Sequence, residues 1–487
     1  MDGNRSLWLI IVYLIISVYL LPFLPVKANK TEGLAIWATT VSLYQSFSFD
    51  ISWAEGLIGK DEKISRRDER IYSQNPPGLA ILGIPVYIIT KFIMRDPLNP
   101  SLGWFLMRFF LCTLPIIFLA YWLFRKDADE LSISILLFAN PLFIYSLLLT
   151  PYVLASCLMY FSFRLIYDPQ RIFLRNCFLA GLLSGLALNC TTNSLIFIII
   201  LAISLVIVEK KEKMPCILAF SLGLAPFLII LFFHSYVISG SIFAHIFMEF
   251  SEFSFKTRNL YDFLLSPQNG LLFYSPILLF SLLLLLISFE KKTARHKVKV
   301  ALILICLAYF CSKNKQSNFP IQEGFVLILP LMMDSFFDGE LYDRSNLWLG
   351  FLFALSVLFN FLPAITLPIV PPEFKYPHNT LWMKLLTEES FFTVNSIGLI
   401  FGPVINKAFL ISISLVLIVF VFHFTWINTR KPYKFLIGAI IGILVASIYI
   451  ILPNFDKQNL QKKRQEIKNS FSLSARMINS SLKKCAS

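Results

Sequence analysis

Long apolar runs separated by short polar links dominate the sequence. Runs of about 18–25 apolar residues are typical of helices that cross a membrane, because its hydrocarbon core is spanned by about 20 residues. The pattern therefore predicts an all-α polytopic membrane protein with about 13 transmembrane helices. The predicted spans cover residues 7–26, 102–124, 131–149, 152–167, 178–188 with its flanks, 195–208, 216–233, 271–289, 298–311, 325–337, 347–370, 404–427 and 435–452.

A long polar stretch follows the first run and is expected to form a first external loop, residues 27–104, with juxtamembrane helices. The first run itself is long for a signal peptide and lacks a small-x-small cleavage site, so we interpret it as a retained anchor. Within the loop, residues 79–94 are apolar but contain Pro85 and Lys91. At about 16 residues this run is short for a span, which favours an interfacial or re-entrant helix.

Basic residues decide the orientation. Clusters of Lys and Arg follow four of the predicted spans, at Arg125 and at residues 210–213, 291–299 and 430–434. All four fall on the cytoplasmic side only if residues 79–94 do not cross, and the positive-inside rule prefers that arrangement. We therefore predict a multi-pass protein of the plasma (inner) membrane with a cytoplasmic N-terminus and an external, periplasmic C-terminus.

The amino-acid composition agrees with a membrane protein and gives no reason to expect nucleic acid as a partner. Hydrophobic residues make up 57% of the 487 residues and charged residues only 15%, well below the charge of a soluble domain. The net charge of +14 is explained by the basic links, so no nucleic acid is expected. Residues 1–452 are predicted to form a single membrane module and residues 453–487 a polar, basic tail. The eight cysteines include no CxxC pair and predict neither a metal site nor a disulfide framework.

Three stretches, in order, resemble a known family. Tyr72-Ser-Gln-Asn-Pro-Pro-Gly78 and the apolar run after it are similar to the pattern Tyr-Ser-x-Lys-x-Pro-Gly of the GT-C glycosyltransferases, specifically the bacterial relatives of protein O-mannosyltransferase and of lipid A aminoarabinose transferase. Residues 234–243 resemble that family's Tyr-Asn-x-x-x-x-Gly-Ser-Pro-Phe, and residues 264–278 its Ser-Pro-x-x-Gly-Leu-Phe-x-Tyr-Ser-Pro. The resemblance extends to about Leu331.

The resemblance implies transfer of a sugar from a polyprenyl-phosphate carrier to a glycan, lipid or protein acceptor outside the membrane. Such a transfer needs a carboxylate that deprotonates the acceptor hydroxyl. Glu32 stands where the family has its acidic residue, just outside the first span, and is the candidate catalytic base. The alternative is a surface acid balanced by Lys27 and Lys30. Some relatives use a divalent metal ion, and this sequence leaves that question open.

The leaving phosphate must be held by cations or hydrogen-bond donors. Asn75 stands where the family often has Lys, and Phe325 about where many members have Arg. Candidate carrier-binding residues are therefore Arg70, Tyr72, Asn75, Pro77, Gly78, Lys256 and Arg258.

Other readings stay open for several of these residues. The arginines around Arg70 also fit a solvated loop, since Asp and Glu neighbours neutralise much of their charge. Pro77 and Gly78 also fit a simple transition from a loop to a helix. Asp50 is expected to cap a helix or turn.

Two other functions remain possible on sequence alone. A flippase or other transporter of lipid-linked saccharides would fit the spans, although internal repeats typical of transporters are not visible. An inactive relative that serves as an assembly partner would fit the missing basic residues.

Overall fold

The computed structural model describes most of the chain. The described residues are 3–20, 32–58, 64–93, 100–167, 173–208, 213–246, 257–287, 294–313, 323–334, 336, 346–366, 370, 373–387, 418–419, 423, 432–451, 461 and 464–466. This part is helical except for one two-stranded hairpin. Four of its helices are long and apolar enough to cross a membrane: Leu102–Phe124, Met214–Ser239, Leu347–Ile365 and Pro432–Ile450. The fold is therefore that of an α-helical integral membrane protein, while the number of 13 spans stays a prediction.

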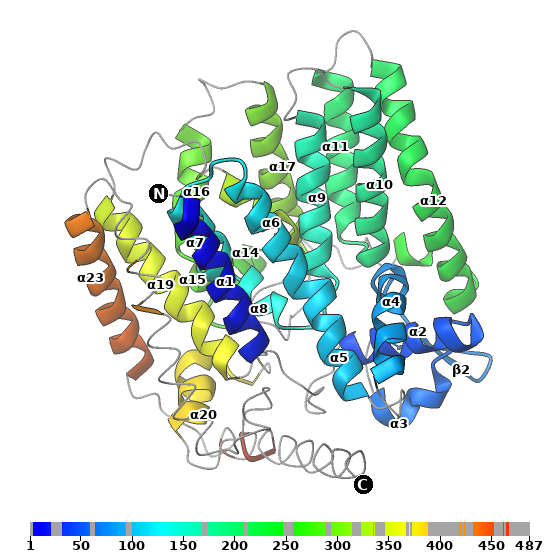
Figure 1. Ribbon diagram of the computed structural model, residues 1–487, viewed down its shortest axis with the longest axis horizontal. Coiled ribbons are helices and arrows are strands. Elements are labelled where there is room, and N and C mark those ends of the chain that lie inside the picture. The colour runs from blue at the N-terminus through cyan, green and yellow to red at the C-terminus, as the bar shows by residue number, and fades with distance from the viewer. Residues whose placement is uncertain are drawn as a thin grey trace.

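Four helices run side by side in one half of the molecule (Figure 1). They are α9 (Tyr152–Tyr167), α10 (Leu174–Cys190), α11 (Ser194–Val208) and α12 (Lys213–Ser239). Glycines let α10 and α12 approach closely: a Cβ on Gly181 would lie 2.1 Å from the carbonyl oxygen of Phe220, and one on Gly223 would lie 2.2 Å from that of Phe178. Small residues at such contacts are typical of helix pairs in membranes.

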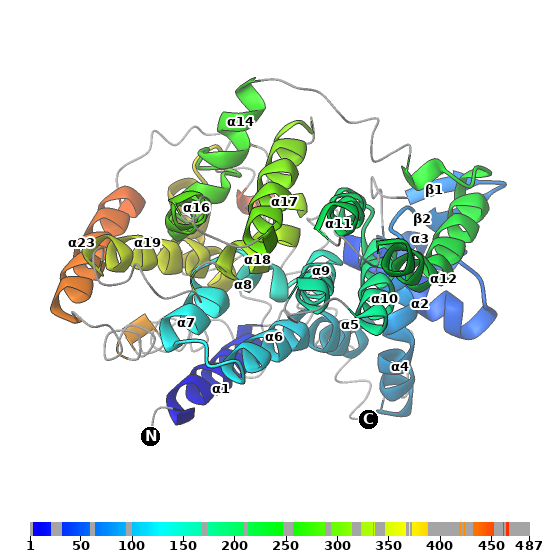
Figure 2. The ribbon, with the colours of Figure 1, turned by 90° about the horizontal axis from the view of Figure 1, so that it is seen from above.

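The other half holds helices from both ends of the chain (Figure 2). It contains α1 (Gly3–Leu20), α6 (Leu114–Phe124), α7 (Glu130–Phe138), α16 (Ile277–Ile287), α17 (Ala294–Cys311), α19 (Asn346–Ile365) and α23 (Pro432–Ile451). Glycines again mark the closest pair, because a Cβ on Gly438 would lie 1.9 Å from the carbonyl oxygen of Leu347. The predicted span 404–427 lies outside the described residues except for residues 418, 419 and 423.

Three predicted spans are broken, which corrects their expected extents. The span 131–149 divides into α7 and α8 (Leu142–Ser146). At the break the Asn140 amide donates to the carbonyl oxygens of Ile135 (2.7 Å) and Leu136 (2.5 Å), and its oxygen accepts from the backbone N–H of Leu142 (2.8 Å). These bonds supply partners to backbone groups at the end of α7, where Pro141 interrupts the helix.

The span 271–289 divides in the same way into α15 (Leu271–Tyr274) and α16. Here the partners come from α19: Asn360 donates to the carbonyl oxygen of Tyr274 (2.8 Å), and the Ser356 hydroxyl accepts from the backbone N–H of Ile277 (3.0 Å). The span 325–337 is likewise a 3-10 helix, Glu323–Ile328, followed by α18 (Leu329–Met333). Non-helical backbone is tolerated at membrane depth where neighbouring helices supply such partners.

Other boundaries also differ from the predictions. The helix predicted at 216–233 extends to Ser239, so the first residues of the expected loop 234–270 are helical. The span predicted to Val370 ends at Ile365. The segment between the predicted spans 347–370 and 404–427 contains a π-helical turn, His378–Trp382, and α20 (Met383–Thr387).

The first loop forms a layer of short elements beneath α9 to α12 (Figure 1). In order it contains α2 (Glu32–Ser46), a 3-10 turn (Ser52–Ala54), α3 (Glu55–Ile58), β1 (Ile64–Arg67), β2 (Arg70–Ser73), α4 (Gly78–Ile93) and the start of α5 (Pro100–Arg108). A separate small core of residues including Trp37, Ile71, Leu79, Tyr87 and Trp104 holds it together. Residues 66–70, for which a solvated loop was one reading, form the end of a hairpin in which β1 pairs antiparallel with β2, and Arg66 and Arg70 remain exposed.

A buried ion network lies toward the opposite end. The Asp334 carboxylate accepts hydrogen bonds from the Tyr160 hydroxyl (2.9 Å), Arg164 (3.1 Å) and Lys299 (2.9 Å). Asp334 and Lys299 are each 4% exposed. The network joins the ends of α9, α17 and α18, and a carboxylate at this depth is tolerated because it is paired.

Candidate functional site

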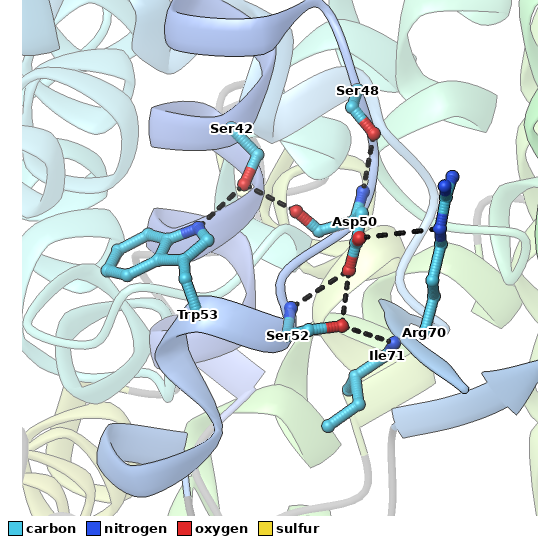
Figure 3. Close-up of polar contacts among 7 residues, drawn as sticks. All are labelled: Ser42, Ser48, Asp50, Ser52, Trp53, Arg70 and Ile71. Atoms are coloured by element: carbon cyan, nitrogen blue, oxygen red, sulfur yellow. Dashed lines mark hydrogen bonds and ion pairs between the residues drawn. The ribbon is translucent and has the colours of Figure 1, made fainter.

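Asp50 organises the link between α2 and the hairpin (Figure 3). Its carboxylate accepts from the backbone N–H (2.9 Å) and the hydroxyl (2.5 Å) of Ser52, and the Ser52 oxygen accepts from the backbone N–H of Ile71 (2.9 Å). The first of these bonds spans two residues and closes an Asx turn. The prediction that Asp50 caps a turn is thus confirmed.

Ser42 ties this link back to α2. Its hydroxyl donates to the carbonyl oxygen of Asp50 (2.7 Å) and accepts from the indole N–H of Trp53 (2.9 Å) (Figure 3). The backbone N–H of Ile51 also donates to the carbonyl oxygen of Ile71 (2.8 Å). Together these bonds fix the hairpin relative to α2, and so fix where the segment after β2 begins.

The three arginines of the hairpin have different environments. Arg70 lies 3.8 Å from the Asp50 carboxylate and is 63% exposed, whereas Arg66 pairs with Glu55 (2.5 Å) on the surface. Arg67 donates to the carbonyl oxygens of Tyr236 (2.8 Å) and Val237 (3.2 Å), which docks the hairpin on the end of α12. An exposed pair as long as that of Arg70 contributes little to stability.

The segment from Tyr72 to Gly78 is largely buried and joins β2 to α4. The Asn75 amide donates to the Ser73 hydroxyl (3.3 Å), and Asn75 is 7% exposed. Gly78 opens α4 directly against the end of α10, because a Cβ there would lie 2.6 Å from the backbone carbon and oxygen of Asn189. Only glycine permits this approach, so the motif's Gly has a packing role.

Two polar pairs lie beyond these segments, on the same side of the helices. The Lys313 ammonium donates to the side-chain oxygen of Asn193 (2.7 Å). Asn193 lies three residues after the end of α10. The Tyr152 hydroxyl donates to the Glu323 carboxylate. The Phe310 ring, three residues before Lys313, lies 2.3 Å from where a Cβ on Gly324 would be, next to Glu323, so both pairs belong to one region.

The start of α2 reaches this region. A Cβ on Gly33 would lie 2.9 Å from the carbonyl oxygen of Leu149, three residues before Tyr152. Glu32 is the first residue of α2, and an acidic residue suits a helix N-terminus. Its side chain lies outside the described part, as do those of Lys256 and Arg258.

Arg108 is a cation that the motifs did not reveal. It is 3% exposed and its guanidinium lies 4.6 Å from the ring centre of Trp104, whose ring in turn packs against Gly33. A signal was present in the sequence, because Arg108 interrupts the apolar run 102–124 and ionisable residues inside such runs often mark function.

His234 lies in a buried cluster of aromatic rings. Its Nδ1 lies 2.9 Å from Nε2 of His245, both rings are buried, and Phe49 packs edge-on to His234 at 4.7 Å. Burial lowers the pKa of His245 to about 4, so the pair is neutral. The contact of His234 with Phe49 packs α12 against the first loop. Among the residues that the structure describes, no three His, Cys, Asp or Glu side chains are placed to hold a metal ion.

Comparisons with known proteins give one structural likeness. No family model matches the chain, and no curated protein matches it. One similar solved structure is that of ArnT from Cupriavidus metallidurans in the apo state, with 13% sequence identity, a TM-score of 0.49, and coverage of 92% of this chain and 76% of that chain. The function of this chain is therefore argued from its own residues and contacts.

Proposed function

We propose that the protein is a GT-C type glycosyltransferase that moves a sugar from a polyprenyl-phosphate carrier to an acceptor hydroxyl at the outer face of the membrane. The observation that carries the proposal is the convergence of the first loop on one polar region. The start of α2, with Glu32, lies beside the turn before Tyr152, and Gly78 of the family-like motif packs on Asn189. The same region holds the Lys313 and Glu323 pairs.

The transfer reaction needs a general base and groups that hold the leaving phosphate, and the chain has a candidate for each. The acceptor oxygen attacks the anomeric carbon while the bond from that carbon to the phosphate oxygen breaks, with inversion. Glu32 accepts the proton of the acceptor hydroxyl, and the carrier phosphate leaves with the bonding electrons. No nucleotide-binding loop is required, because the carrier brings its own leaving group.

Residues of the first loop would hold that leaving group. Arg70 is exposed and close in sequence to the motif, and Tyr72 and Asn75 offer hydrogen-bond donors, while Pro77 and Gly78 set the course of the backbone. Lys256 and Arg258 are further candidates from the loop after α12. Charge-assisted contacts to phosphate are roughly twice as strong as neutral ones.

One observation favours a second candidate, a relative without activity. Phe325, which stands about where many family members have Arg, is fully buried and packs on Phe310 and Phe263, with ring centres 5.9 and 6.4 Å away. The 3-10 helix that carries it thus has an aromatic core in place of a cation. A chain of this kind would keep the fold and serve as an assembly partner.

The test is mass spectrometry of external glycans and glycolipids from cells with the gene, without it, and with the gene carrying Glu32→Gln. The proposal predicts a glycoform that disappears in both the deletion and the Gln strain. A glycoform that disappears in the deletion and returns with the Gln variant would favour the non-catalytic relative. Unchanged glycans in all strains would contradict both.

A further inference from the structure

Helix α4 is apolar on both of its sides. One side is buried against α2, α5 and α10. The other side exposes an apolar residue at every turn, and these residues form one stripe: Ile81, Pro85, Ile89, Phe92 and Ile93. The one charged residue of α4, Lys91, lies apart from the stripe, with its ammonium 5.0 Å from the ring centre of Tyr44. A helix that is apolar all round is normally enclosed by protein or by lipid.

The start of α4 lies at the depth of the membrane. Gly78 packs on Asn189, whose amide donates to the carbonyl oxygen of Phe227 (2.6 Å), so α4 begins level with Phe227 of α12. From there α12 continues with exposed apolar side chains, among them Phe233 (61%) and Tyr236 (54%). Nine helical residues from Phe227 to Tyr236 rise about 13 Å. This is close to half of a hydrocarbon core of about 30 Å, so α4 begins inside one leaflet.

The other end of α4 lies near the surface of the same leaflet. A Cβ on Gly103 would lie 3.5 Å from the methyl group of Thr90, near the end of α4. Gly103 is close to the start of the apolar helical stretch Leu102–Phe124, whose other end is followed by Arg125 and Lys126. A core spanned by about 20 residues, counted back from Phe124, ends near the next residue after Trp104. Seen from above, α4 lies at the edge of the helices (Figure 2).

We propose that the exposed stripe of α4 binds membrane lipid, so that α4 lies obliquely in the leaflet on the side of the first loop. Ile81 and Ile89 contact acyl chains, and Phe92 and Ile93 lie at the boundary with the headgroups, where Lys91 extends toward water. The proposal does not rest on the proposed function. Its consequence is that α4 is held at both ends, by Asn189 at Gly78 and by lipid at Phe92.

The experiment measures quenching of a bimane probe on a single cysteine in the cysteine-free, full-length protein, reconstituted in phosphatidylcholine vesicles. At Ile89→Cys, a lipid with a doxyl group on its acyl chain should cause a large loss of emission, and aqueous iodide a small one. The control is Asp68→Cys at the tip of the hairpin in the same loop, where the side chain is 84% exposed. There iodide should quench strongly and the lipid weakly.

Two results would overturn the proposal. Iodide quenching at Ile89→Cys as strong as at Asp68→Cys would mean that the stripe faces water. Protection of Ile89→Cys from both quenchers would mean that protein, such as a second copy of this chain, covers it. Should Ile89→Cys fail to fold, Ile93→Cys probes the same stripe at a residue that is 64% exposed, and the same outcomes decide.

Discussion

Asp334 is buried between two cations, and its side chain connects α9, α17 and α18. Its carboxylate satisfies Lys299 and Arg164 at 2.9 and 3.1 Å. Replacing one partner of such a network leaves the remaining charge in a place that water reaches poorly. Breaking a buried ion pair in this way costs far more than the pair contributes to stability.

We therefore predict that Asp334→Asn lowers the free energy of unfolding by about 3–5 kcal/mol, because the buried Lys299 and the partly buried Arg164 lose this counter-charge. Thermal unfolding of the purified protein in detergent measures the effect. The control is Glu55→Gln, which breaks the exposed pair with Arg66 (2.5 Å) and should change stability by about 1 kcal/mol or less. Equal stability of the two variants would show that the Asp334 network does not hold the helices.

Only part of the site could be predicted at the residue level. The turn at Asp50 could be predicted from the local sequence, and Gly78 with the prolines before it predicted the start of α4. Turn capping and the backbone preferences of Pro and Gly both act over a few residues. The pairs Lys313–Asn193 and Tyr152–Glu323 join positions 120 and 171 residues apart. No local pattern encodes such contacts, which exist only after the helices pack.

At the level of elements, α4 is held by the contact of its first residue with α10. We predict that Gly78→Ala destabilises the protein by about 1–3 kcal/mol and reduces transfer, because the added methyl meets the Asn189 backbone at 2.6 Å and no side chain can move aside. Thermal unfolding and donor turnover measure the two effects. Gly56→Ala is the matched control in the same loop, since a Cβ there meets nothing within 4 Å; if the two variants behave alike, the close approach is unimportant.

The helical class of most runs followed from hydrophobicity, but their breaks did not. Pro141 and Pro276 indicated possible interruptions, but a proline inside an apolar run can either kink a helix or end it. What decides is whether a neighbour satisfies the freed backbone, and here Asn140 and Asn360 do so. The hairpin at 64–73 was missed because charged residues fill it and its stability comes from docking on α12.

For the whole molecule, the proposed topology puts the first-loop layer and α20 outside and the link after α6 inside. Single cysteines in a cysteine-free background test this with a membrane-impermeant thiol reagent on intact cells. We predict labelling at Phe47→Cys and Tyr376→Cys, which are 93% and 48% exposed, and none at Lys126→Cys until the membrane is opened. Labelling of Lys126→Cys from outside with Tyr376→Cys silent would mean that α4 crosses the membrane and would reverse every later span.

The central claim, carboxylate-assisted sugar transfer, depends on Glu32. General-base help contributes about 10²–10⁴-fold to such a step, and Glu32→Gln keeps the size of the side chain while removing the base. Glu32→Asp keeps the base but shortens its reach, so it should retain some activity. Glu55→Gln, in the same loop, is the control for a surface acid.

The most direct measurement is sugar transfer by the purified protein in lipid vesicles, with the carrier and acceptor identified from the deletion strain. We predict that Glu32→Gln lowers the rate by at least about 100-fold, with unchanged folding and carrier binding, while Glu55→Gln transfers at the normal rate. Normal transfer by Glu32→Gln would contradict the assignment of the base, and Glu323 would then be the next carboxylate to test.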